Sequence, residues 1–193
     1  MLKRADNNYG VRIAMTRKIA ILYKSKHGST RKYAEWIAEE LSADLFDAEK
    51  TAIKELSDYH TIIFGGFLYA GTISGVNLLT ENMDKLGGKR IIVFAVGCAP
   101  ERKENIRHVF FKNFASNIRD RVALFYLRGA FNFQKLNLLD KFLIFVLKTK
   151  IKHTKPEKLD EDSKGFLEVC EKPADWTNKE STKPLIEFIA KLS

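Results

Sequence analysis

Short apolar runs alternate along this chain with segments in which apolar residues recur at helical spacing. The runs predict buried strands, because each is too short for a helix and ends at glycine or polar residues. They cover residues 19–23, 44–47, 60–64, 90–96 and 122–127. Helical spacing predicts a helix after the first run, where Tyr33, Ile37 and Leu41 share one face. The same spacing predicts further helices along residues 76–86, 106–114, 136–150 and 185–192.

The alternation of strands and helices predicts an α/β domain. Its sheet is expected to be parallel and covered by helices on both faces, because right-handed crossovers place them there. Residues 1–17 precede the first strand, and we expect them to form an N-terminal extension outside the ordered fold. Residues 18–193 then form a single domain. Within it, residues 156–177 are rich in charge and are predicted to be a loop.

Three loops follow strands at one edge of this sheet, where open α/β sheets bind their ligands. They are residues 25–30, 66–72 and 97–100. The first is a hydroxyl-rich turn at the start of a helix, whose free amides and dipole favour a phosphate. It lacks the glycines of a dinucleotide-binding fingerprint and the Gly-Lys-Ser/Thr ending of a P-loop. As an alternative, its Ser and Thr residues are simple helix N-caps.

The other two loops suit a flat heteroaromatic ring. Residues 67–71 offer apolar and aromatic surface, and residues 97–100 are small enough for close backbone approach. The alternative for the first of these loops is that its aromatic residues only pack over the end of the sheet. Cys98 either approaches the ring or fills a small buried space.

Length and composition fit one globular domain, with 193 residues of which 45% are hydrophobic. The longest strongly apolar stretch, residues 142–147, is far shorter than the roughly 18 residues of a membrane-spanning helix. No secretory signal is recognisable, so we expect a cytoplasmic protein. Cys98 and Cys170 lie far apart and the four histidines are scattered, so no metal site is expected.

The net charge of +9 is unevenly distributed. Residues 129–158 carry seven lysines against Asp140 and Glu157, a local net charge of +5. Nucleic acid, an acidic membrane surface, and an acidic small molecule or protein all satisfy such a charge, and a solvated lysine face is the alternative. The apolar run within this segment must face either the domain or a partner. For peripheral contact with an anionic membrane, the candidate residues are Lys135, Lys141, Lys148, Lys150 and Lys152.

The opening segment, Lys18-Ile-Ala-Ile-Leu-Tyr-Lys-Ser-Lys-His-Gly-Ser-Thr, resembles the first strand and phosphate loop of flavodoxins and flavodoxin-fold oxidoreductases. Residues 65–71 and 96–99 resemble the two flavin-ring loops of these proteins. The resemblance covers residues 18–128. It implies a flavodoxin-like doubly wound sheet of five parallel strands in the order 2-1-3-4-5, and FMN as the cofactor.

A narrower resemblance begins after residue 128. Residues 127–131 and 139–148 are similar to the basic helical insertion of the quinone-dependent protoporphyrinogen oxidases, which implies such an insertion at about residues 129–177. That family binds FMN noncovalently and oxidises protoporphyrinogen with a quinone. The likeness implies that FMN carries the chemistry without a catalytic side chain. It places the phosphate on Ser25, His27, Gly28, Ser29 and Thr30, and the ring against Gly66, Phe67, Leu68, Tyr69, Ala70, Gly71, Gly97, Cys98, Ala99 and Pro100.

The sequence departs from the pattern of that family at two places, and both concern substrate binding more than flavin binding. Ala70 stands where that subgroup tends to have an aromatic residue, and residues 156–177 are longer than expected. One hypothesis is therefore an FMN-dependent oxidoreductase that acts on an organic substrate or quinone. The other is a non-enzymatic flavodoxin that carries electrons between protein partners. Carrier flavodoxins are typically acidic, so the basic charge and the insertion favour the enzyme. A flavin-free RNA-binding module has no recognised motif here, and no nucleic-acid partner is expected.

Overall fold

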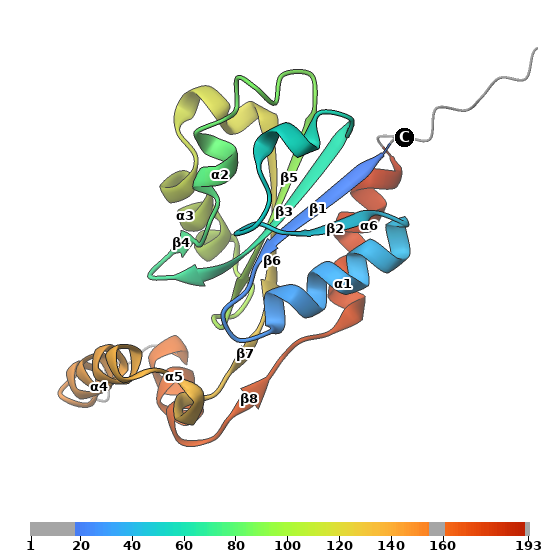
Figure 1. The fold of residues 1–193 in the computed structure, drawn as a ribbon. Coiled ribbons are helices and arrows are strands. Elements are labelled where there is room, and N and C mark those ends of the chain that lie inside the picture. Colours follow the sequence, from blue (N-terminus) through green and yellow to red (C-terminus); the bar gives the residue numbers. More distant parts are fainter. Residues whose placement is uncertain (1–17, 155–160, 192–193) are drawn as a thin grey trace, which may run out of the picture.

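The computed structural model describes residues 18–154 and 161–191. A parallel sheet forms the centre of the domain (Figure 1). Its strand order is β2-β1-β3-β5-β6, which confirms the predicted order of the five main strands. These strands are β1 (Ile19–Lys24), β2 (Asp44–Asp47), β3 (Thr61–Tyr69), β5 (Arg90–Gly97) and β6 (Val122–Arg128).

Helices cover both faces of the sheet (Figure 1). On one side lie α1 (Ser29–Leu41) and α6 (Lys183–Ala190), and on the other lie α2 (Asn77–Thr80) and α3 (Lys103–Asn113). Successive strand residues point to opposite faces, so Ile62 packs into one apolar cluster and Ile63 into the other. Burial on both faces explains why the strands are continuous apolar runs rather than alternating patterns.

The predicted helix over residues 76–86 is wrong in length. Only Asn77–Thr80 are α-helical, and turns follow as far as Gly88. Backbone bonds there span three residues, as from the amide of Asn82 to the carbonyl of Leu79 at 3.0 Å. The Asn82 side-chain amide donates to the carbonyl of Leu78, so it competes with the helical pattern. The apolar residues Val76, Leu79, Met83 and Leu86 are nevertheless buried. Hydrogen bonds between residues three apart also place such residues on one side of the segment.

The predicted insertion forms a helical arm between two short paired strands. The strands β7 (Ala130–Phe131) and β8 (Ala174–Asp175) are antiparallel, and α4 (Leu138–Lys152) and α5 (Glu161–Glu171) lie between them. Figure 1 shows this arm beyond the end of the sheet, apart from the helices that cover its faces. The predicted loop at residues 156–177 is therefore wrong over its described part. Its apolar residues at 166, 167, 169 and 170 sit on α5 despite Gly165, an unfavourable helix residue.

Smaller elements complete the described chain. A short strand, β4 (Thr72–Ile73), pairs with the end of β3 as a hairpin. Short 3-10 helices are η1 (Ile53–Leu56), η2 (Ser116–Arg121), η3 (Phe133–Lys135) and η5 (Lys179–Thr182). Among the described residues, no helix is both long enough and apolar enough to cross a membrane. The expected N-terminal extension, residues 1–17, lies outside the described residues.

Candidate functional site

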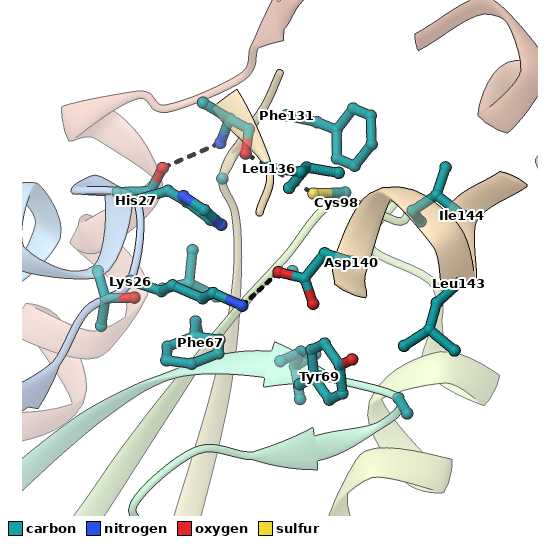
Figure 2. Close-up of a pocket in the computed structure, with 18 of the residues that line it drawn as sticks. Lys26, His27, Phe67, Tyr69, Cys98, Phe131, Leu136, Asp140, Leu143 and Ile144 are labelled. Carbon is teal, nitrogen blue, oxygen red and sulfur yellow. Dashed lines mark hydrogen bonds and ion pairs between the residues drawn. The ribbon is translucent and has the colours of Figure 1, made fainter. Parts of the chain in front are cut away.

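A pocket of about 450 Å³ lies beyond the carboxyl ends of the strands, between the three predicted loops and the helical arm (Figure 2). This volume is within the range of about 300–1,000 Å³ that is typical of small-molecule sites. Nine predicted site residues line it: His27, Ser29, Thr30, Phe67, Leu68, Tyr69, Ala70, Gly97 and Cys98. Its lining does not include Ser25, Gly28, Gly66, Gly71, Ala99 or Pro100.

The first loop presents the start of α1 to the pocket. Gly28 precedes the helix with a φ of 95°, a conformation that favours glycine, and its amide donates to the Ser25 hydroxyl at 3.2 Å. Ser25 and Gly28 therefore shape the loop rather than line the pocket. Among the described residues, no side chain caps the first turn of α1. Its first amides and the Ser29 and Thr30 hydroxyls thus stand at one end of the pocket.

His27 lines the pocket next to this helix start. Partial burial and the neighbouring Lys26 ammonium lower the pKa of the His27 imidazole, and Asp140 offsets part of the shift. The ring is therefore mainly neutral at neutral pH, with one nitrogen able to donate and the other to accept a hydrogen bond.

The second loop is a tight hairpin between β3 and β4. Tyr69 pairs with Thr72, and both residues between them have a positive φ, 48° at Ala70 and 78° at Gly71. This is the two-residue turn that matches the twist of paired strands. Lys112 donates to the carbonyl of Ala70, so α3 helps to hold the turn.

Two predicted glycines of this loop, Gly66 and Gly71, lie next to other parts of the protein and do not line the pocket. A Cβ on Gly71 would lie 3.4 Å from Lys112, on the α3 side of the hairpin. A Cβ on Gly66 would lie 2.7 Å from the carbonyl oxygen of Ser74 and 2.5 Å from the Ile73 side chain. Close packing of β4 against β3 thus requires glycine at position 66.

The third loop brings Gly97 and Cys98 to the pocket. A Cβ on Gly97 would lie 2.5 Å from the Tyr126 hydroxyl, which donates to the carbonyl of Ala99 at 2.8 Å. Cys98 lines the pocket and is exposed as a residue, although its thiol is partly desolvated. Desolvation raises the pKa of its thiol, which lies 3.8 Å from the carbonyl oxygen of Ala130. The thiol is therefore protonated at neutral pH.

The arm supplies a further wall that the sequence did not predict. Apolar side chains of α4 face the pocket, together with the first residues after β6. These residues are Gly129, Ala130, Phe131, Leu136, Asp140, Leu143, Ile144 and Leu147. Lys26 and Val96 also line the pocket. A signal for this wall was present in Asp140, the one acidic residue within a basic and apolar helix.

Lys26 and Asp140 form an ion pair across the pocket (Figure 2). It joins the first loop to the first turn of α4, where the amide of Asp140 donates to the Asn137 side chain at 2.7 Å. The Lys26 ammonium lies 5.5 Å from the centroid of the Tyr69 ring. Its hydrogen bond to Asp140 is the main cause that lowers the pKa of this carboxyl, although burial opposes it. Asp140 is therefore ionised at neutral pH, and its charge is matched by that of Lys26.

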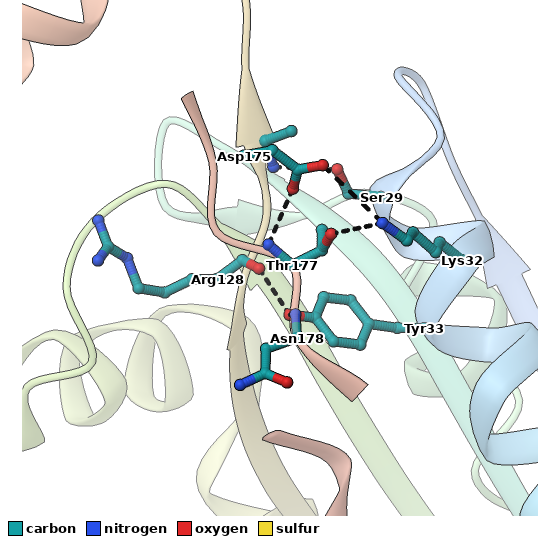
Figure 3. A network of polar contacts seen from close by, with 8 residues as sticks. Ser29, Lys32, Tyr33, Arg128, Asp175, Thr177 and Asn178 are labelled. Carbon is teal, nitrogen blue, oxygen red and sulfur yellow. Dashed lines mark hydrogen bonds and ion pairs between the residues drawn. The ribbon is translucent and has the colours of Figure 1, made fainter. Parts of the chain in front are cut away.

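A second polar network fixes the base of the arm to α1 (Figure 3). The Tyr33 hydroxyl donates to the carbonyl of Arg128 at 2.7 Å and accepts from the amide of Asn178 at 3.1 Å. Lys32 donates to the Thr177 hydroxyl at 2.8 Å. The Ser29 hydroxyl accepts from the amide of Ala130 at 3.0 Å. Both ends of the arm are thus attached to the helix that begins at the pocket.

A family model described as Flavodoxin domain matches residues 20–158. The match runs from β1 beyond the end of α4, so it includes the three loops and the wall formed by the arm. This chain therefore belongs to the flavodoxin-domain family.

Individual relatives match to a smaller extent. Over 55 residues the chain is 42% identical to an uncharacterised protein of Methanocaldococcus jannaschii, which covers 28% of this chain and 37% of that protein. The match thus spans well under half of that relative. Flavodoxin 1 of Bacillus cereus is 18% identical with a TM-score of 0.44, over 72% of this chain and 99% of that one. A flavoprotein of Lactobacillus acidophilus, solved in complex with FMN, is 19% identical with a TM-score of 0.37. The match covers 58% of this chain and 92% of that one.

Proposed function

We propose that this protein binds FMN noncovalently and works as an oxidoreductase on an apolar organic substrate, with a quinone as electron acceptor. Protoporphyrinogen is the candidate substrate. The observation that carries the proposal is the apolar wall of α4, which faces the loops predicted to hold the flavin ring. A carrier that exchanges electrons only with proteins has no need of such a chamber.

The pocket residues fit FMN. A phosphate suits the uncapped start of α1, where amides, the helix dipole and the hydroxyls of Ser29 and Thr30 converge. The ring suits the space between residues 67–70 and residues 97–98, because these side chains are mostly apolar. One phosphate cradle without a dinucleotide fingerprint favours FMN over FAD.

Bound FMN supplies the electron transfer, and the protein supplies binding, orientation and the surrounding electrostatics. The hairpin of residues 69–72 is held by α3, so Tyr69 is fixed at the edge of the pocket. Leu143, Ile144 and Leu147 present an apolar surface on the side that a substrate would occupy. The Lys26–Asp140 pair places two opposite charges beside this apolar surface without adding net charge.

Titration with FMN, riboflavin and FAD tests the cofactor. FMN should bind more tightly than riboflavin, because riboflavin lacks the phosphate. Ser29→Ala should weaken FMN binding by about tenfold or more, since a hydrogen bond to a charged group contributes about 1.5–3 kcal/mol, and should change riboflavin binding little. Thr51→Ala is the matched control, because it removes a hydrogen-bonded hydroxyl that does not line the pocket. A protein that ignores all three flavins would contradict the proposal.

Anaerobic photometry of the loaded protein tests the reaction. After chemical reduction of the flavin, a soluble quinone should reoxidise it at a rate that saturates with quinone concentration, as expected for a binding site. Porphyrinogen should in turn reduce the oxidised protein. A flavin that reacts with protein electron carriers but shows no saturable reaction with quinones would instead identify a flavodoxin carrier.

A further inference from the structure

Helix α4 is apolar on two opposite sides. One side faces the pocket with Leu143, Ile144 and Leu147. The opposite side, here called the outer face, is exposed to solvent. It consists of Leu138, Leu139, Phe142, Phe145 and Val146, whose exposed fractions are 86%, 65%, 62%, 63% and 49%. The spacing of these residues, at 3.6 residues per turn, places them on one stripe.

The outer face is unusual for this molecule. Most of the large apolar side chains that are exposed in the described chain belong to α4, whereas Leu45, Phe111 and Phe188 are scattered singly. Single exposed apolar residues are common on protein surfaces, but a contiguous exposed patch indicates an interaction site. A helix that only closed the pocket would need one apolar side.

Apart from Asp140, the charged residues of α4 are lysines. Lys141, Lys150 and Lys152 have no ion-pair partner among the described residues. By contrast, Lys148 pairs with Glu171 of α5 at 3.5 Å. The acidic residue of α4, Asp140, is buried on the pocket side. An apolar stripe bordered by lysines is the pattern of helices that lie in the interface of anionic membranes.

Position also favours a flat, extended partner. Figure 1 shows α4 at the far end of the arm, beyond the carboxyl ends of the strands. We propose that the outer face of α4 docks peripherally onto an anionic membrane surface, with its apolar residues at the acyl boundary and Lys141, Lys150 and Lys152 at the headgroups. A second copy of the chain is a poorer occupant, because its own lysines would face these. The docking goes beyond the proposed function and stands independently of flavin binding.

The proposal has a geometric consequence for the site, and this step rests on the proposed function. The outer face and the pocket wall are opposite sides of one helix, so docking would bring the pocket within a helix diameter of the lipid. A quinone or another apolar compound dissolved in the bilayer would then have a short path to the chamber.

Co-sedimentation with vesicles tests the docking. The full chain should pellet with phosphatidylcholine mixed with phosphatidylglycerol at low salt, much less with phosphatidylcholine alone, and progressively less as salt screens the charges. Replacing Lys141, Lys150 and Lys152 by Gln should weaken binding by about fivefold per lysine, because each contributes about 1 kcal/mol near an anionic surface. The control replaces Lys54, Lys103 and Lys191 by Gln, which changes net charge equally at exposed sites elsewhere. It should bind like the wild type.

A matched pair of variants tests the contribution of the apolar residues to vesicle binding. Phe142→Ser should reduce vesicle binding, whereas Phe111→Ser, at an exposed phenylalanine of α3, should not. A tryptophan placed by Phe145→Trp should show a blue-shifted emission only with anionic vesicles. Circular dichroism and FMN titration verify that each variant is folded and loaded, so a failure of flavin binding is distinguished from a failure of docking.

Three results would overturn the proposal. One is a wild-type protein that stays in the supernatant with anionic vesicles at low salt. Another is equal binding by the variant that lacks the three α4 lysines. The last is a stable dimer in sedimentation equilibrium that Phe142→Ser dissociates, because a second copy would then cover the outer face.

Discussion

Lys26 and Asp140 lie 114 residues apart in the sequence, yet their ion pair links the first loop to the arm. The side chain of Asp140 is only 9% exposed and that of Lys26 is 31% exposed. A pair in this setting is less screened by water than a surface pair, so removal of one partner leaves a poorly solvated charge. Neither residue was among the predicted site residues, because no local pattern shows which side chains meet after folding.

A double-mutant cycle on this pair should show energetic coupling. We expect Lys26→Met and Asp140→Asn to be non-additive in the free energy of unfolding by about 0.5 kcal/mol or more at neutral pH, as contacting residues are. The pKa of Asp140 is lowered from its ordinary value of 3.8, so the pair stabilises the fold above that value. The coupling should disappear as pH falls through the lowered pKa. Urea unfolding of the four proteins over a pH series measures it.

The control for this cycle is the exposed pair of Arg31 and Glu35, at 2.7 Å on the surface of α1. Arg31→Met and Glu35→Gln should couple more weakly, because both side chains are exposed to solvent. Equal coupling in both cycles, or coupling at Lys26 and Asp140 that persists at acidic pH, would contradict the assigned role of this pair.

Glycines show how far a local pattern predicts a site. The positive φ of Gly28 could be anticipated, because a strand must turn sharply into a helix there. Gly97 lines the pocket, but a Cβ there would also lie 2.5 Å from the Tyr126 hydroxyl. Gly66 and Gly71, in contrast, are explained by close strand packing and by the hairpin turn. A sequence shows that glycine is needed at a position, but not whether a ligand or a neighbouring strand needs it.

At the scale of elements, the sheet was the most predictable part of the molecule. Its central strands β1, β3 and β5 are apolar runs that are buried on both faces, so local pattern and tertiary environment agree. The arm was the least predictable part. Its strands β7 and β8 have two residues each, which is too short for a visible alternation, and they pair with each other although residues 132–173 lie between them. The sequence of α5 is likewise rich in charge, so a loop was predicted where a helix forms.

Tyr33 should be the main link between the arm and the domain. Its side chain is fully buried, and its hydroxyl joins the carbonyl of Arg128 to the amide of Asn178. Tyr33→Phe leaves both backbone groups without this partner, so we expect a loss of about 1–3 kcal/mol in the free energy of unfolding. Tyr59→Phe is the control, because that hydroxyl donates to an exposed carboxylate of Asp44 at 2.8 Å. Equal losses in urea unfolding would argue against the link.

At the scale of the whole molecule, the domain and the arm are separate in their packing. Two apolar clusters, one on each face of the sheet, form the core of the domain. Neither cluster includes a residue from 129–177. Most apolar residues of α4 line the pocket or are exposed to solvent instead. The core of the domain is therefore built without the arm, and the arm instead forms the pocket wall and the outer face.

Removal of the arm should separate these functions. Because Phe131 pairs with Ala174, a short glycine-containing turn can replace residues 132–173 while β7 and β8 remain paired. We expect this shortened chain to unfold cooperatively and to bind FMN within about tenfold of the full chain, since the start of α1 and the two ring loops are unchanged. The saturable reaction with quinone should be lost together with the apolar wall, and so should binding to anionic vesicles. Circular dichroism, FMN titration and photometry measure these outcomes in one preparation. A shortened chain that fails to fold would show that the arm belongs to the core, and one that retains the quinone reaction would remove the pocket wall from the proposed function.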